Sequence, residues 1–562
     1  MADQNLKEER DEAAEKKRDP KKDAEEAFKR LGILKGKRAL FDTLWQQLAD
    51  YFLPNKNVIL RVGSEGENKY IRLYDSTGAQ ANELLAGALH SMLTNPSSYW
   101  FEFTTGDKDL DDDDDVRKWL QDTAHVAHEL MNNSNFQTEI HELYLDEGTF
   151  GIGAMSIEED KETVIRFSAK PIKNCWVEEN NKGFIDTVFY SYMWKPRLIL
   201  QEFQDKAPAW VEEAAEKNPD NEYELLQVIE PNQEYDPGKK LSIQGKKYRS
   251  CTYLKGTEAN DFATLEERGF STWPWVTPRW AKATGETYGR SPAMKCLPEV
   301  KMINEMMREL IRAQQKATNP PLLVPDDGIV GSLKLTPGGI NYYRSGSGDF
   351  IKPLESGANL QLSYEMMDDV RKRIRDSFYI DQLQLQEGPQ MTATEVMQRT
   401  EEKIRLLGPL LGRQHSELLR PLIERVYEIM NRRGLVPKIP AKLSGKKIDV
   451  KYRSMLAKAQ LQSEAQNIIR AIQTAEPFLN LDPNSKDVID CDGGVKFAAE
   501  LYGLPEKLIR DKKAIQDIRT ARDQANQAML QQQQQQQQAE QLAKVAPAVK
   551  MAHEMGQGSP AK

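Results

Sequence analysis

The sequence predicts a predominantly helical α+β fold. Through most of the chain apolar residues recur every three or four positions, which is typical of amphipathic helices. Between about Phe150 and Leu254 the pattern changes to short apolar segments separated by turns, which indicates antiparallel strands. With 39% hydrophobic residues among 562, the chain can bury a sizeable core, so disorder throughout is excluded.

Composition narrows the classes of function. With 29% charged residues and a mean hydropathy of -0.66, the chain is more polar than a compact enzyme, which favours extended surfaces or tails that meet partners. A net charge of -9 argues against a protein that binds nucleic acid strongly over its whole surface. It does not argue against a protein that lets DNA slide along it. The four cysteines are far apart, so we expect reduced thiols without a disulfide framework or zinc knuckle. They are Cys175, Cys251, Cys296 and Cys491.

The sequence shows no membrane or export signal. No apolar stretch approaches the ~18–20 residues that span a bilayer, and the first residues carry no signal-peptide core. We therefore expect a soluble protein, made in the cytoplasm and without membrane insertion.

The first half of the chain reads as a charged arm followed by an α+β unit. Residues 1–27 are mixed charges with almost no apolar residues, which indicates a frayed helix or a disordered arm. Residues 28–290 then combine helices with short strands, among them Tyr99–Phe103 and four strands from Gly151 to Tyr192. The aromatic segment Trp273–Trp280 is expected to wedge against that sheet.

The middle of the chain predicts two antiparallel helices with a small β insert. Residues 291–318 form the first helix, 319–358 a Pro- and Gly-rich insert, and 359–381 the second helix. At 1.5 Å per residue each helix is roughly 30 Å long. The predicted inner stripes are Val300, Ile303, Met307, Leu310 and Ile311 in the first helix and Leu362, Met366, Val370, Ile374 and Phe378 in the second.

Beyond the second helix the pattern is a loop, a kinked helix and a helical tail. Residues 382–391 are rich in Gln, and Thr392 with Glu395 forms a capping box that starts a long helix. That helix is expected to break at Gly408-Pro409, bend at Pro421 and stop at Gly434, before a short strand near 448–452. It belongs to a predicted unit 392–455, followed by a helical unit 456–511 and a Gln-rich tail 512–562. The run Gln531–Gln538 is either helical or part of a disordered tail.

Catalytic chemistry is not evident. His125 and His128 are three residues apart with His141 nearby, but no carboxylate or cysteine falls at matching helical spacing, so packing is favoured over a metal site. Glycines 148, 151 and 153 lack the Lys-Ser/Thr of a phosphate loop and read as a helix-to-strand turn. The acidic run Asp111–Asp115 is expected to be solvated. We predict no catalytic residue, no metal and no cofactor, and therefore not an enzyme.

Three motifs together resemble the portal, or head-to-tail connector, proteins of short-tailed bacteriophages. The first is Tyr74-Asp-Ser-Thr-Gly-Ala-Gln-Ala-Asn-Glu-Leu-Leu-Ala-Gly-Ala-Leu with Asn95-Pro and Trp100-Phe. The second is Pro278-Arg-Trp280, Gly285-Glu-Thr-Tyr-Gly-Arg-Ser-Pro292, Asn304 and Asn319-Pro-Pro321. The third is Met391-Thr-Ala-Thr-Glu-Val396, Arg399, Glu402, Leu407-Gly-Pro409, Arg413, Glu417-Leu-Leu and Pro421. The likeness covers about residues 28–455.

The resemblance implies a ring of about twelve subunits at one capsid vertex. A terminase would pump DNA through the ring, and the tail would attach to it later. In family terms 28–290 is the wing, the two helices are the stem, 319–358 is the clip and 382–391 the tunnel loop. Residues 456–511 would form a crown and 512–562 a helical barrel or Gln-rich tail. The implied partners are further copies of the chain, double-stranded DNA, the terminase large subunit, major capsid and scaffolding proteins, and tail adaptors; the implied location is the virion.

The dimensions suit a DNA conduit. Twelve stem helices at ~10 Å spacing give a circle roughly 38 Å across, which leaves a lumen of about 27 Å after one helix diameter is subtracted. That lumen admits duplex DNA loosely. A strongly basic lining would hold the phosphates, so mixed or acidic charge is the expectation for a channel through which DNA moves.

Three groups of residues are the candidate sites. Gln384, Gln386 and Gln390 could hydrogen-bond phosphate without a full charge, with a plain linker as the alternative. Arg308, Arg312 and Lys316 are expected to form ion pairs, within the helix to Glu305 and Glu309 or between subunits, rather than to contact DNA. Tyr342, Tyr343 and Arg344 could anchor a terminase or adaptor, or else be buried strand positions.

Two other functions remain open from the sequence. A DNA-processing enzyme would need a metal–carboxylate cluster or a P-loop, neither of which we find. A scaffold or adaptor without a DNA role would be a monomer or small oligomer.

Overall fold

The computed structural model covers most of the predicted α+β body. The chain divides into two compact units, residues 1–106 with 119–459 and residues 107–118 with 460–562, and each is described by itself. Described are residues 20–61, 73–256, 261–318, 322–323, 352–353, 360–380, 408–452 and 510–555, apart from positions 112, 240, 241, 444, 445, 447 and 511, and a few isolated residues elsewhere.

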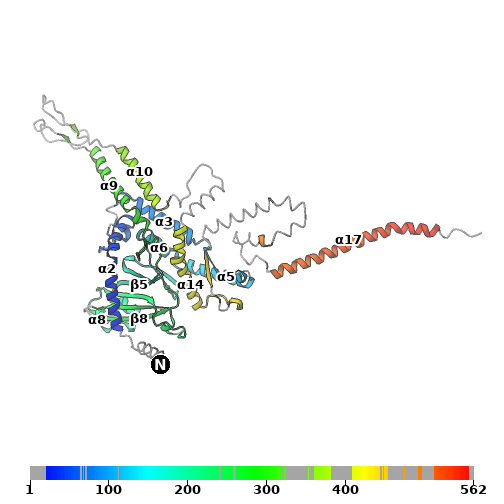
Figure 1. The fold of residues 1–562 in the computed structure, drawn as a ribbon, viewed down its shortest axis with the longest axis horizontal. Helices are drawn as coiled ribbons and strands as arrows, with labels where there is room; N and C mark the ends of the chain where they lie inside the picture. Colours follow the sequence, from blue (N-terminus) through cyan, green and yellow to red (C-terminus); the bar gives the residue numbers. More distant parts are fainter. Residues whose placement is uncertain are drawn as a thin grey trace, which may run out of the picture. The chain divides into compact units, whose positions relative to one another are not determined.

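The helix α2 (Pro20–Phe52) runs along one face of a β-sheet (Figure 1). Its Ala24, Ala27 and Leu31 pack on Trp176 and Phe189 of the sheet. The helix therefore starts eight residues before the predicted boundary at Phe28. The expectation of a frayed or disordered arm is wrong for residues 20–27, because two alanines among charges give little periodic signal yet fit closely between helix and sheet.

Five antiparallel strands form the largest sheet, with each strand beside its neighbour in sequence. Two short helices cover the face opposite α2, where Ile199 and Val211 pack on Leu225 and Leu254. Because both faces are covered, Leu225 and the adjacent Leu226 are both fully buried. The strands are β4 (Cys175–Glu179), β5 (Ile185–Trp194), β6 (Tyr223–Pro231), β7 (Tyr248–Lys255) and β8 (Phe262–Phe270), and the helices α7 (Pro196–Phe203) and α8 (Ala209–Lys217).

Smaller sheets tie distant segments together. The aromatic segment packs against the sheet as expected, with the ring centroids of Trp275 and Tyr190 5.6 Å apart. It also supplies strand β9 (Trp275–Val276), which pairs with β2 (Met155–Glu159). Strand β2 also pairs with β3 (Ile165–Ala169). The predicted strands at Tyr99–Phe103 and 448–452 pair with each other as β1 (Phe101–Thr104) and β12 (Asp449–Tyr452).

The glycine-rich segment after α6 (Phe136–Phe150) is a helix-to-strand turn, as expected. Gly151 caps the helix with φ +79°, in the left-handed region that favours glycine. A Cβ on Gly151 would meet the carbonyl oxygen of Gly289 at 2.6 Å, so two backbones approach where side chains cannot fit. Helix α3 (Thr77–Leu93) also belongs to the first unit, α4 (Lys108–Asp111) belongs to the second, and α5 (Asp114–Asn133) begins in the second and continues into the first.

The predicted helix pair consists of α9 (Pro292–Thr318) and α10 (Leu360–Ser377), which lie side by side (Figure 1). Most of the predicted inner stripe is buried, including Val300 and Ile374. Two positions were wrong: Ile311 is 38% and Met366 54% exposed, and Met367 is buried instead. In the insert, β10 (Leu322–Leu323) pairs with β11 (Lys352–Pro353).

The kinked helix ends where predicted and carries an irregularity beside the predicted bend. Helix α13 (Gly408–Arg413) continues through a π-helical turn, 414–419, into α14 (Arg420–Arg432). Pro421, which has no backbone N–H to donate, comes two residues after the end of the π-turn, so the irregularity adjoins the predicted bend. Gly434, with φ +69°, follows the helix end. The predicted capping box at Thr392 and Glu395 lies outside the described residues.

In the second unit, a single long helix spans the glutamine run. Helix α17 (Lys512–Met555) includes Gln531–Gln538, so the helical alternative holds for that run. A long helix without Pro or Gly inside its Gln-rich part is consistent with the good helix propensity of Gln and Ala.

Candidate functional site: a helix pair and its two junctions

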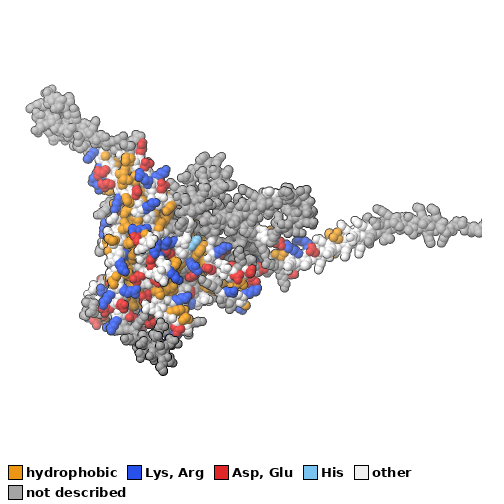
Figure 2. Space-filling view, in the orientation of Figure 1, with side chains coloured by type: hydrophobic (Ala, Val, Ile, Leu, Met, Phe, Trp, Pro, Cys, Tyr) orange, Lys and Arg blue, Asp and Glu red, His pale blue; other side chains and the backbone are white. Residues whose placement is uncertain are grey.

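Two of the three predicted cations on α9 are paired with acids of the same helix. Arg308 pairs with Glu305, and Arg312 Nη1 lies 2.7 Å from Glu309 Oε1. Lys316, the third predicted cation, is exposed near the end of the helix and forms no ion pair with the described residues, so its predicted pairing is not seen within this chain. Figure 2 shows Lys/Arg and Asp/Glu side chains interspersed around apolar ones on the visible face of the helix pair.

The other two predicted groups lie outside the described residues. These are Gln384, Gln386 and Gln390 of the predicted tunnel loop, and Tyr342, Tyr343 and Arg344 of the predicted clip. Their roles stay predictions.

A first junction fastens both helices of the pair to the segment that precedes α3. The side-chain oxygen of Asn304 on α9 accepts from the backbone N–H of Tyr74 (2.8 Å) and of Asp75 (3.1 Å). Its amide nitrogen donates to the carbonyl of Val300 at 2.9 Å, and Asn304 is only 4% exposed. On α10, Arg371 donates from Nε (3.1 Å) and Nη2 (2.9 Å) to one carboxylate oxygen of Asp75.

Asp75 is held as an anion at this junction. Burial alone would raise the pKa of Asp75, but hydrogen bonds from Thr77 and Arg371 outweigh it and hold the pKa below its ordinary value. The backbone N–H of Thr77 donates to Asp75 Oδ1 at 2.9 Å, so the same carboxylate caps the start of α3. One side chain therefore orients α3 and α10 together.

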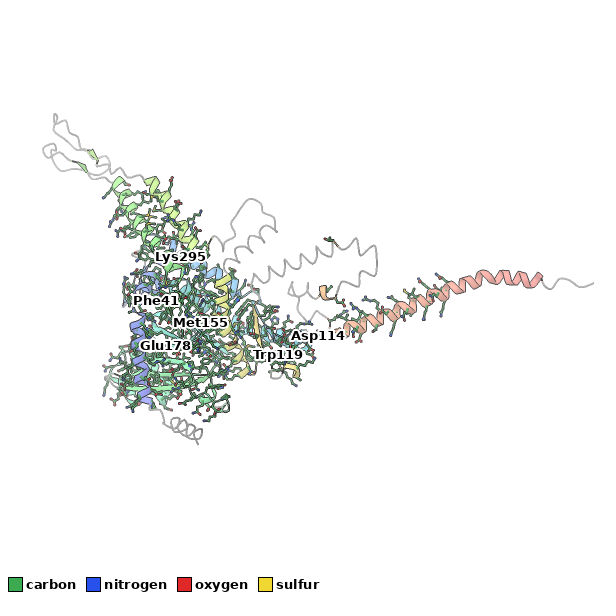
Figure 3. All side chains as sticks on the ribbon, viewed as in Figure 1. Phe41, Asp114, Trp119, Met155, Glu178 and Lys295 are labelled. Atoms are coloured by element: carbon green, nitrogen blue, oxygen red, sulfur yellow. The ribbon has the colours of Figure 1, made fainter. Side chains whose placement is uncertain are left out.

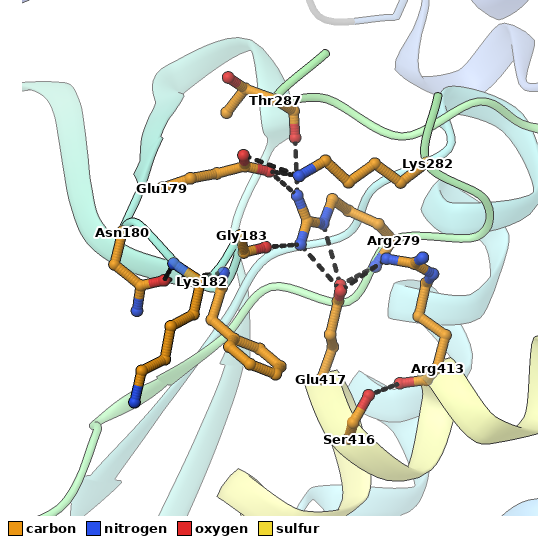
Figure 4. Close-up of polar contacts among 11 residues, drawn as sticks. Glu179, Asn180, Lys182, Gly183, Arg279, Lys282, Thr287, Arg413, Ser416 and Glu417 are labelled. Carbon is orange, nitrogen blue, oxygen red and sulfur yellow. Dashed lines mark hydrogen bonds and ion pairs between the residues drawn. The ribbon is translucent and has the colours of Figure 1, made fainter. Parts of the chain in front are cut away.

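A second junction centres on Arg279, which is 0% exposed (Figure 4). Its Nε and Nη2 donate to the two carboxylate oxygens of Glu417 at 3.0 and 2.8 Å. Its remaining donors reach Glu179 and the carbonyl oxygens of Thr287 (3.1 Å) and Gly183 (2.8 Å). All five guanidinium N–H groups thus have acceptors, on the β4–β5 hairpin, the 278–290 segment and the π-turn.

Two further cations balance the acids around Arg279. Arg413 Nη1 lies 2.8 Å from Glu417 Oε1, and Lys282 Nζ lies 2.6 Å from Glu179 Oε1. Burial tends to lower the pKa of Arg279, but its bonds to Glu417 and Glu179 raise it overall. A buried guanidinium is stable only when its partners are complete, so this junction depends on every member.

A buried contact also ties the π-turn to α6. Gln414, the first residue of the turn, donates to Oε1 of Glu147, and both side chains are fully buried. Burial raises the pKa of Glu147 to about 8, and the charge of Glu417 adds to this. At neutral pH this carboxyl is largely protonated.

These junctions were not predicted, although several of their residues belong to the motifs quoted from the sequence. Arg279, Asn304 and Glu417 belong to the motifs that carry the resemblance, and Asp75 to the first of them. Arg279 and Glu417 are 138 positions apart, so one sequence gives no sign that they touch. The sequence feature that could have indicated a buried ion pair is a charged residue within an otherwise apolar, aromatic segment, as in Pro278-Arg-Trp280.

The histidines weighed as metal ligands lie among aromatic rings. His128 stacks on Phe101 with ring centroids 4.2 Å apart, and burial lowers its pKa to about 4. His125 packs edge-on against Tyr99 at 4.6 Å, and His141 against His90 at 6.2 Å. Among the described residues, no three His, Cys, Asp or Glu side chains gather as metal ligands would.

Helices of the membrane-spanning kind are absent from the part of the chain that the structure describes.

Side chains pack throughout the first unit, where Lys295 lies at the base of α9 and Glu178 beside α2 (Figure 3). Glu178 there pairs with Arg30 of α2, with Nη2 and Oε2 2.6 Å apart.

Comparisons with known proteins agree with the motifs. The "Probable portal protein" of Bordetella phage BPP-1 is 29% identical over 510 residues, which are 89% of this chain and 91% of that protein. The "Portal protein" of Salmonella phage epsilon15 is 29% identical over 514 residues, 90% of this chain and 92% of that protein. That of Enterobacteria phage T3 is 22% identical over 176 residues, 30% of this chain and 32% of that protein.

Among solved structures, a chain from the "Virion of native gene transfer agent (GTA) particle" aligns with a TM-score of 0.38 and 10% identity, covering 76% of this chain and 88% of that chain. This overall likeness is weak and adds nothing to the assignment. The family described as "Bacteriophage head to tail connecting protein" matches residues 24–509, which include both junctions and the helix pair. This chain therefore belongs to the bacteriophage head-to-tail connecting protein family.

Proposed function

We propose that copies of this chain form a ring, of about twelve subunits, at one vertex of a phage capsid. The helix pair of each copy would line an axial channel through which double-stranded DNA enters during packaging and leaves during ejection. A terminase would dock on the ring during packaging, and tail adaptors would follow. Major capsid and scaffolding proteins would surround it during assembly in the host cytoplasm.

The observation that carries this proposal is the charge pairing on α9. Each neutralised phosphate releases counterions, so a lining of free cations would hold DNA in place. Arg308 and Arg312 are already matched by Glu305 and Glu309 on the same helix, which leaves Lys316 as the one unpaired member of the three predicted cations among the described residues. A lining of that kind lets phosphates pass with little net attraction.

The two junctions support the same role mechanically. Asp75 joins the helix pair to α3, and Arg279 joins the sheet hairpin to the π-turn. Force exerted on the channel by moving DNA would thus be carried into the body through charge-assisted hydrogen bonds, which are about twice as strong as neutral ones.

Mass measurement and imaging test the ring directly. The assembled protein should have about twelve times the 64.1 kDa of one chain and show an axial hole wider than a DNA duplex, roughly 20 Å or more. A monomer, or a ring with a narrower hole, would refute the proposal.

The predicted DNA and partner contacts need a separate test in a packaging reaction. Replacing Gln384, Gln386 and Gln390 with Ala should leave the ring intact and increase slippage of packaged DNA. The matched control replaces Gln532 and Gln535 of the glutamine run, and it should package normally. Replacing Tyr342, Tyr343 and Arg344 should weaken terminase or adaptor binding without changing the ring.

A further inference from the structure

A cleft of about 250 Å³ with both polar and apolar walls lies beside the Arg279 junction and shares Glu417 with it. It opens between the start of β5, the start of β7, the segment after β8, and the π-turn with α14. Its volume lies below the range of pockets for drug-sized ligands, roughly 300–1,000 Å³, so it suits a group of about one side chain.

Aromatic rings form part of the wall of the cleft. Tyr248 and Trp273 pack edge-to-face with centroids 5.1 Å apart and an interplanar angle of 62°. Phe184, which directly precedes β5 and is 47% exposed, also lines the cleft. Aromatic ring faces attract cations through their quadrupoles, most strongly where water is partly excluded.

The carboxylates of the cleft are incompletely neutralised. Glu417 is matched by Arg279 and Arg413, as described above. Glu424 meets only Arg420, an exposed i,i+4 pair with a separation of 3.0 Å, and such pairs contribute little. Within the described residues no Lys or Arg pairs with Asp186, which accepts a hydrogen bond from Thr187 Oγ1 at 3.1 Å. Lys247, which is exposed, also lines the cleft.

The lining of the cleft carries three carboxylates, Asp186, Glu417 and Glu424, and one cation, Lys247. Burial raises the pKa of the Tyr248 hydroxyl, and the charges of Asp186 and Glu424 raise it further. Burial also raises the pKa of Asp186, with Glu178 and Glu230 adding to it. Both shifts indicate that a positive charge nearby would stabilise the ionised form of these carboxylates.

We propose that this cleft binds an organic cation, a guanidinium or a primary ammonium group, between Asp186 and Glu424 and against the rings of Tyr248 and Trp273. A divalent metal fits less well, because it prefers about six oxygen ligands and the walls are partly aromatic. An anion is excluded by the surrounding carboxylates. The cation comes either from an Arg or Lys side chain of a neighbouring copy or from a free polyamine.

Calorimetry with arginine ethyl ester tests the proposal, with the uncharged citrulline ethyl ester as the matched ligand. The full-length protein is titrated as separated assembled and unassembled fractions. We expect one site per chain for the arginine ester and no heat of binding for the citrulline ester. Binding to both fractions identifies a free cation as the natural ligand, and binding to the unassembled fraction alone identifies a neighbouring copy.

Variants assign the binding to this cleft. Asp186→Asn with Glu424→Gln keeps the shape and should weaken binding at least tenfold, and Asp186→Asn alone should show part of that loss. The control, Glu213→Gln with Asp220→Asn, removes two exposed carboxylates of the same sheet unit and should bind like the parent. Equal binding of both esters, unchanged binding by the cleft variants, or no binding to either fraction would overturn the inference whether or not a ring forms.

Discussion

Removing the charge of Glu417 should release the second junction. In Glu417→Gln the amide keeps the size of the side chain but offers one acceptor where the carboxylate offers two. Arg279 then keeps a buried charge with fewer partners, because Glu417 accepts from its backbone N–H, its Nε and its Nη2. Breaking one partner of a buried ion pair typically costs about 3–5 kcal/mol.

Hydrogen exchange followed by mass spectrometry is the suitable assay, because it reports local opening in a large chain. A loss of about 3 kcal/mol corresponds to roughly a hundredfold faster exchange, since each 1.4 kcal/mol is tenfold. We expect that change in peptides from the β4–β5 hairpin around Gly183 and from 414–432. Peptides from α8 should be unaffected.

The matched control is Arg290→Lys. Arg290 pairs with Glu286 four residues away, with its side chain 44% exposed, so its loss should change exchange less than threefold. If Glu417→Gln leaves exchange around Gly183 within threefold of the parent, then the five satisfied donors of Arg279 do not hold the junction together and the reasoning is wrong.

Three further outcomes follow from the structure. The folded-state pKa of Glu147, about 8, lies above its ordinary value of 4.5, so the stability that Glu147 contributes is complete below pH 4.5 and is lost as pH rises through about 8. The unfolding temperature, measured from pH 5 to 9, should show this decline, and the variant Glu147→Gln should not show it. Asp75→Asn should loosen α10 and the start of α3 by about 3 kcal/mol, and unchanged exchange in both helices would contradict that. Gly289→Ala should lower the unfolding temperature, because its Cβ would meet the backbone oxygen of Gly151. The control Gly87→Ala, on the open face of α3, should not lower it. Equal unfolding temperatures for the two variants would count against the close approach of the two backbones.

Local patterns were sufficient for most helices and strands. The stripes of α9 and α10, the strand at Phe101 and the end of the kinked helix at Gly434 follow from side-chain periodicity and from the φ that glycine permits. The errors fall where periodicity is weak. Ala24 and Ala27 are small, and Met366 and Met367 are adjacent and equally apolar, so packing alone decides which one is buried.

By itself the amino-acid sequence determined the fold class, the paired helices and, through three motifs in order, the family. Only the tertiary structure decided which charges meet: Asp75 with Arg371, Arg279 with Glu417, and Glu147 beside Gln414. The reason is physical. Helix and strand formation depends on residues a few positions apart, whereas a buried ion pair depends on where distant segments come to lie and on how completely they exclude water.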